Sequence, residues 1–209
     1  MVEETKDNKE IILDIISKAF AHVKEAYDFT QNLNSSDHSR LIFPRKRDES
    51  IRVSEQELRF AFVEEFLKNK EAKAKDWYYA IEVPTKGVYD FSDKEAPKVA
   101  EEGKGQSANF DLAIYTKDGN NVKWIALLEF KAGNPDKFEY HKDLVKLENK
   151  KEGGNGILRF FIEIVENADS GTTKNIESKL KDKRQQTNFI CYSLKKGEKV
   201  LELLQSEKD

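Results

Sequence analysis

The sequence has one cysteine, Cys191, among 209 residues. A single cysteine excludes an internal disulfide and a cysteine-based metal cage, and it fits the reducing cytoplasm. No apolar run is long enough to span a bilayer, so we expect a cytoplasmic protein with no membrane contact. The first ten residues are polar and acidic, unlike a secretory signal peptide.

The chain also lacks an excess of positive charge, since its net charge is -3. Any contact with nucleic acid must therefore come from a local basic patch. The three histidines, His22, His38 and His141, have no metal-ligand spacing. The glycine-rich segment at 153–156 lacks the Lys-Ser/Thr of a phosphate loop, and no serine nucleophile elbow is present. The sequence therefore does not favour a histidine-ligated metal site, a phosphate-loop enzyme or a serine hydrolase.

What the chain does have is a hairpin pattern that carries unexpected charge. Two apolar runs, 110–115 and 122–128, flank Lys-Asp-Gly-Asn-Asn, a sequence typical of a β-turn. Asp111 interrupts the first run, and Glu129 and Lys131 close the second on one face of the strand. Two carboxylates converging on one sheet face repel each other unless a cation lies between them. The pattern therefore predicts a metal site.

The rest of the chain predicts alternating helices and strands. A helix between two strand patterns indicates a crossover that joins parallel strands. We therefore predict an α/β fold in which a mixed central sheet is covered by helices on both faces. Ser54 and Glu57 have capping-box spacing at the start of the second helix, and 85–105 is predicted to be a loop. The expected helices are 9–33, 54–70, 136–151, 173–186 and a short last one through Val200, Leu201 and Leu204; the other expected strands are 76–83, 157–165 and 188–194.

The first helix has an apolar stripe that fits packing within the molecule better than packing on a partner. We expect an N-terminal helical arm over 1–40 and one domain over 41–209. The oligomeric state stays open, a homodimer included, and an assembly role for the arm is the weakest alternative.

An aspartate in one strand, Glu-x-Lys in the next and a glutamate on the preceding helix resemble the PD-(D/E)xK nuclease superfamily. The matching residues are Asp111, Glu129 and Lys131, with Glu57 or Glu64 on the helix. The resemblance covers about 53–165 and implies the restriction-endonuclease-like αβββαβ core. Phe110 stands where the family often has proline.

The resemblance implies a Mg²⁺- or Mn²⁺-dependent nuclease that hydrolyses phosphodiester bonds, with DNA as the expected partner. Asp111, Glu129 and the backbone carbonyl of Phe130 would hold the metal, which prefers oxygen ligands. Lys131 would orient the attacking water or stabilise the transition state. Glu57, preferred over Glu64, would hold a second ion, although a plain capping role explains it nearly as well.

Two basic segments are candidates for nucleic-acid binding. Lys142, Lys146 and Lys150 recur at helical spacing after the hairpin. Arg45, Lys46 and Arg47 form a triplet. For both segments an ordinary solvated surface is the alternative. For the whole protein, the alternative is a nuclease-like fold without turnover that binds nucleic acid or a protein partner.

Overall fold

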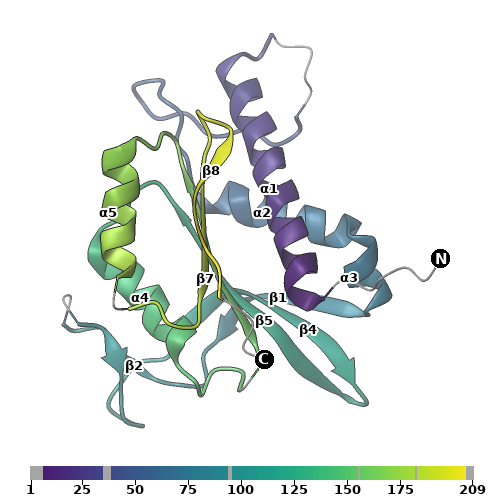
Figure 1. The fold of residues 1–209 in the computed structure, drawn as a ribbon, viewed down its shortest axis with the longest axis vertical. Coiled ribbons are helices and arrows are strands. Elements are labelled where there is room, and N and C mark those ends of the chain that lie inside the picture. The colour runs from purple at the N-terminus through teal and green to yellow at the C-terminus, as the bar shows by residue number, and fades with distance from the viewer. Residues whose placement is uncertain (1–6, 35–38, 94–95, 155, 182, 206–209) are drawn as a thin grey trace. The chain divides into compact units, whose positions relative to one another are not determined.

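The chain folds into two compact units, Met1–Trp77 and Tyr78–Asp209 (Figure 1). The structure is a computed structural model that describes residues 7–34, 39–93, 96–154, 156–181 and 183–205.

The first unit is helical, with α1 (Asn8–Gln31), α2 (Glu55–Lys68) and α3 (Lys70–Ala74). The predicted apolar stripe of α1 is buried, as expected. The Asn69 side chain accepts from the first backbone N–H groups of α3 and donates to Asp14 of α1 at 3.1 Å. The first helix is therefore tied to the start of α3 within the first unit, and the predicted arm over 1–40 stays a prediction.

The capping box predicted for α2 is wrong. Ser54 does stand at the N-cap, but its side chain makes no hydrogen bond to the helix backbone. Its hydroxyl instead donates to the carboxylate of Glu57. A side chain engaged in this way leaves the first N–H groups of α2 without the predicted cap.

The second unit contains a six-stranded sheet in the order β1-β4-β5-β6-β7-β8. β5 and β6, and β6 and β7, are parallel, whereas β4–β5 and β7–β8 are antiparallel. The predicted mixed α/β sheet and its hairpin are confirmed. The elements are β1 (Trp77–Pro84), β2 (Tyr89–Asp90), β3 (Lys98–Val99), β4 (Asn109–Asp118), β5 (Asn121–Ala132), α4 (Lys137–Glu148), β6 (Leu158–Val165), α5 (Ser170–Leu180), β7 (Asn188–Ser193) and β8 (Glu198–Leu203).

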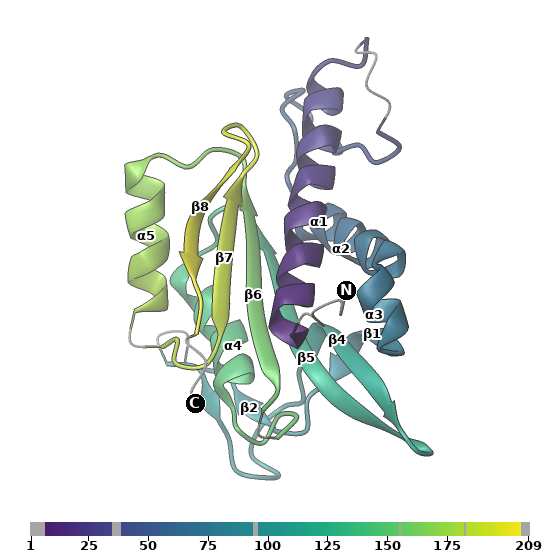
Figure 2. The same ribbon diagram turned by 45° about the vertical axis from the view of Figure 1, so that its right-hand side comes forward.

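Helices α4 and α5 lie on the same face of this sheet (Figures 1 and 2). Their apolar side chains and those of the strands form one buried cluster, which includes Phe110, Leu127, Tyr140, Leu144, Phe161, Ile176 and Phe189. Helical cover on this face is as predicted, and cover on the opposite face stays a prediction. The α4 face is the one that carries the candidate site.

The last helix predicted from the sequence is wrong, because Glu198–Leu203 forms strand β8. Gly197, with φ of 68°, closes a turn in which its N–H donates to Ser193 O at 2.8 Å. The chain returns along β7, with Ser193 opposite Glu198. Pairing with the open edge of β7 thus outweighs the weak helical spacing of three apolar residues.

Helix α5 ends six residues before the sequence predicted, at Leu180 instead of 186. The carboxylate of Glu148, the last residue of α4, accepts the backbone N–H groups of Gln185, Gln186 and Thr187 at 2.8–3.0 Å. Those N–H groups are therefore not available for further turns of helix.

The loop before the hairpin contains β2 and β3, a small antiparallel pair, and a buried acid binds its start. Glu152 accepts from the N–H groups of Lys86 and Gly87, at 2.9 and 2.7 Å, and from the Tyr89 hydroxyl at 2.6 Å. A Cβ on Gly87 would come within 2.7 Å of the Asn149 amide nitrogen. One carboxylate thus fixes this loop beside the end of α4.

We expect Glu152→Gln to lower the free energy of unfolding by about 2 kcal/mol, because an amide NH₂ would face backbone donors. The exposed Glu102→Gln is the matched control and should leave it unchanged. Urea unfolding of both variants measures the effect. Equal stabilities would contradict the assignment of Glu152 as the acceptor that fixes the loop.

Candidate active site

The site begins where β4 and β5 stop pairing. Their register runs from Asp118 opposite Asn121 to Leu112 opposite Leu128. Beyond Leu112, the side chain of Asp111 accepts the backbone N–H of Phe130 at 2.7 Å. A carboxylate therefore stands between the two strands, bound to the N–H of the peptide group that joins Glu129 to Phe130.

The three hairpin residues predicted for the site share the face that α4 covers. Ala113 pairs with Leu127, and both belong to the core beneath α4. Because side chains alternate along a strand, Asp111, Glu129 and Lys131 lie on that same face. The structure thus brings these three predicted residues together.

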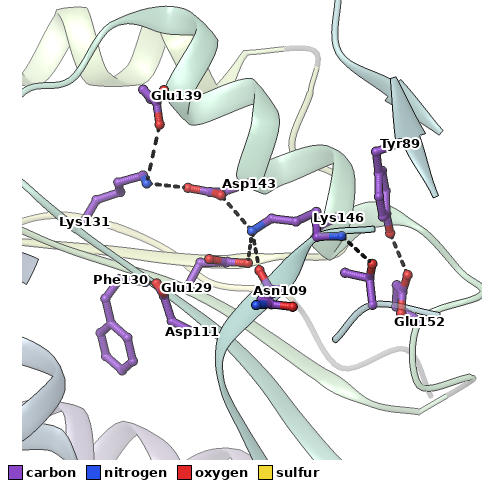
Figure 3. Close-up of polar contacts among 12 residues, drawn as sticks. Tyr89, Asn109, Asp111, Glu129, Phe130, Lys131, Glu139, Asp143, Lys146 and Glu152 are labelled. Atoms are coloured by element: carbon purple, nitrogen blue, oxygen red, sulfur yellow. Dashed lines mark hydrogen bonds and ion pairs between the residues drawn. The ribbon is translucent and has the colours of Figure 1, made fainter. Parts of the chain in front are cut away.

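Helix α4 places further charges above them. Asp136 caps its start by accepting from Glu139 N at 3.0 Å. Residues three and four positions apart share a helix face, so Glu139, Asp143 and Lys146 all point toward the strands. Figure 3 shows the resulting series of contacts from Glu139 through Lys131, Asp143 and Lys146 to Glu129.

Lys146 lies at the centre of this series. Its ammonium group is 2.6 Å from Glu129 Oε1 and 2.9 Å from Asp143 Oδ1, and it donates to Asn109 O at 2.8 Å. The side chain is only 5% exposed. Lys146 was predicted to contact nucleic acid, and that role stays a prediction, but its charge faces buried carboxylates instead of solvent.

Lys131 forms the second ion pair, at 2.6 Å from Asp143 Oδ2 and 4.0 Å from Glu139. Its side chain is 15% exposed, so it lies nearer to solvent than Lys146. The sequence predicted that a metal must separate the converging carboxylates. The structure shows that two lysines already provide much of that compensation.

Four carboxylates, those of Asp111, Glu129, Glu139 and Asp143, and two ammonium groups interact here, which leaves two negative charges in excess when all are ionised. Burial raises the pKa of Glu129, and Asp143 and Asp111 raise it further against the effect of Lys146. Burial, aided by Asp143, likewise raises the pKa of Asp111. Around these acids, an added positive charge is favourable.

For Asp143 and Lys146, the nearby opposite charges shift the pKa in the direction opposite to that of burial. Burial alone would raise the pKa of Asp143, but Lys146 and Lys131 lower it. Burial would lower the pKa of Lys146, yet Glu129 and Asp143 raise it above its ordinary value. Asp143 and Lys146 are thus held in their charged forms.

The donor atoms of this region suit a hard cation. Carboxylate and backbone carbonyl oxygens surround the Lys146 ammonium, and Asp111 stands beside the Phe130 peptide. Mg²⁺ and Mn²⁺ prefer oxygen ligands of these kinds. The residues present therefore fit a divalent ion in donor type and in charge.

A further buried acid, Glu163, lies next in the sheet, with Lys131 and Cys191 as its register partners on β5 and β7. The Tyr140 hydroxyl of α4 donates to its Oε2 at 2.5 Å. Sequence reasoning missed Glu163, although it is the one acid inside the apolar run of β6, as Asp111 is in β4.

Sequence reasoning also missed Asp143 and the buried place of Lys146. Asp143 and Lys146 are three positions apart on α4, and each precedes a buried leucine, Leu144 or Leu147. This spacing was the signal that the sequence offered. Charged residues on helices are usually solvated, so this signal is weak.

The other predicted residues have neighbours of their own within their units. Lys142 is half-buried, with its ammonium 5.8 Å from the centre of the Phe91 ring. Arg45 donates to the carbonyls of Thr30 and Glu49, at 2.6 and 3.0 Å. The residues predicted for the site from the first unit are Arg45, Lys46, Arg47, Glu57 and Glu64, and their part in it stays a prediction.

Among the described residues, one group of three histidine or acidic side chains has ligand atoms within 4.8 Å of one another: His22, Glu64 and Glu65 in the first unit. Lys68 already pairs with both glutamates, at 2.8 and 3.0 Å. Spacing could not reveal this group, because α1 and α2 bring distant residues together. His38 lies outside the described residues.

Comparison of the chain with protein-family models, with curated proteins and with solved structures found no match. Among the described residues, no helix combines the length and apolar character that crossing a membrane requires.

Burial raises the pKa of Glu163 to about 8. In the unfolded chain a glutamate loses its proton above about pH 4.3. Folding therefore takes up a proton between these values, and the contribution of Glu163 to stability falls as pH rises from about 4.3 to about 8. We expect the stability of the unchanged protein to fall by about 3 kcal/mol between about pH 5 and about pH 8 relative to Glu163→Gln. Urea unfolding at both pH values checks this, and parallel pH profiles would contradict it.

Proposed function

We propose that the second unit is a metal-dependent nuclease of the PD-(D/E)xK type, which hydrolyses phosphodiester bonds of nucleic acid, DNA in the first place. The observation that carries the proposal is the convergence of Asp111, Glu129 and Lys131 at the end of the β4–β5 pairing, on the face covered by α4. The mixed α/β sheet, with α4 as the crossover between two parallel strands, supports it.

In this proposal Asp111, Glu129 and the Phe130 carbonyl hold one Mg²⁺ or Mn²⁺. The bound ion would neutralise the phosphate and lower the pKa of the attacking water. Lys131 would orient that water and balance charge on the phosphate. The ion pair with Asp143 at 2.6 Å positions the Lys131 ammonium on this side of the sheet.

We expect Asp111→Asn and Glu129→Gln each to lower cleavage of DNA about 100-fold or more, because each removes a charged metal ligand. Lys131→Met should lower kcat while leaving Mn²⁺ binding within about twofold. The assay uses supercoiled plasmid, single-stranded DNA and RNA with Mg²⁺, Mn²⁺ or EDTA.

Asp118→Asn is the matched control, since Asp118 is an exposed aspartate on the same strand. It should keep full activity. Undiminished cleavage by the Asp111 or Glu129 variant would overturn the proposal, as would a wild-type protein that cleaves none of the three substrates.

The ion pair between Lys146 and Glu129 favours a second candidate, a nuclease-like module that binds nucleic acid or a protein without turnover. A lysine ammonium that pairs with a proposed metal-ligand carboxylate stabilises such a site without any metal ion. Nucleic-acid binding by wild-type protein, with no cleavage and no Mn²⁺ binding at millimolar concentration, would favour this candidate.

A further inference from the structure

Three oxygens lie within 2.9 Å of the Lys146 ammonium group. It donates to Asn109 O at 2.8 Å and forms ion pairs with Glu129 Oε1 and Asp143 Oδ1, at 2.6 and 2.9 Å. These oxygens come from β4, β5 and α4, respectively. The chain therefore supplies its own cation at an oxygen-lined position beside the proposed metal ligands.

A second cation on Glu129 would lie close to this ammonium, in a region where water screens charges weakly. The two positive charges would repel each other while they share one carboxylate. Lys146 has another carboxylate within reach, because it already contacts Asp143. The ring of Phe110, 5.8 Å away, gives its ammonium a further favourable neighbour.

We propose that Lys146 is the resident cation of this site, and that a divalent metal binds by displacing its ammonium from Glu129 while Asp143 retains it. This inference rests on the proposed function for the identity of the metal ligands. It assigns to Lys146 a positioning role that sets how tightly the site binds metal. No covalent or redox step is involved.

The main test is Mn²⁺ binding to the full chain, measured by calorimetry. Lys146→Met removes the competing charge, and we expect it to bind Mn²⁺ about tenfold or more tighter than wild type. Lys146→Arg keeps the charge and should bind as weakly as wild type. Lys137→Met, at an exposed position of the same helix, should change the affinity by less than about twofold.

Removal of Lys146 also leaves buried acids with less compensation, so the variant is expected to be less stable in EDTA. Mn²⁺ should then raise the Tm of Lys146→Met more than that of wild type, because the ion replaces the missing charge. Adding Glu129→Gln to Lys146→Met should abolish both the tighter binding and the extra rise in Tm.

Equal or weaker Mn²⁺ binding by Lys146→Met, or a variant that Mn²⁺ neither binds nor stabilises, would overturn the inference. Tighter binding by Lys146→Arg as well would also overturn it, since the charge would then not be the cause. The nuclease proposal fails separately: tighter binding in Lys146→Met with no cleavage by any form would leave the inference standing and remove the enzymatic activity.

Discussion

The ion pair between Lys146 and Glu129 holds the second unit's candidate site together. It joins α4 to β5, and through the Asn109 carbonyl it also joins α4 to the start of β4. Both side chains are almost fully buried, so each charge needs an opposite charge or a hydrogen-bond partner close by. The contact thus links α4 to the end of the hairpin, where the ion pair between Lys131 and Asp143 also lies.

This constraint explains why the site combines so many charges with an apolar core. Tyr140, Leu144 and Leu147 of α4 pack on the sheet, while Asp143 and Lys146 on the same helix face the charged end of β5. The apolar contacts fix the helix, and the fixed helix lets the buried charges meet at hydrogen-bond distance. A loosely held helix would let water enter and weaken each pair.

Much of the fold could be predicted from the sequence, because its signals are local. The Asp-Gly turn and two apolar runs predict the hairpin, and strand patterns separated by a helix predict parallel pairing. The helix predicted at the end of the chain was wrong, because this segment forms β8. That strand depends on pairing with the edge of β7, which spacing alone does not reveal.

Part of the candidate site could also be predicted, because some of its signals are local. Asp111 and Glu129 stand out as acids within or beside apolar runs, whereas Asp143 and Lys146 resemble ordinary charges of a solvated helix. Their burial follows from how α4 lies on the sheet, which is a tertiary property. The sequence therefore revealed the need for a positive charge and missed that the chain supplies part of it.

We propose that Asp111 and Glu129 form one cation site from which Lys146 withdraws. A crystal structure of the protein with Mn²⁺, with the ion located by its anomalous scattering, tests it most directly. We expect a Mn²⁺ ion about 2.2 Å from oxygens of both carboxylates, with the Lys146 ammonium still on Asp143 and no longer in contact with Glu129. An ion bound elsewhere, or none while Lys146 still contacts Glu129, would contradict it.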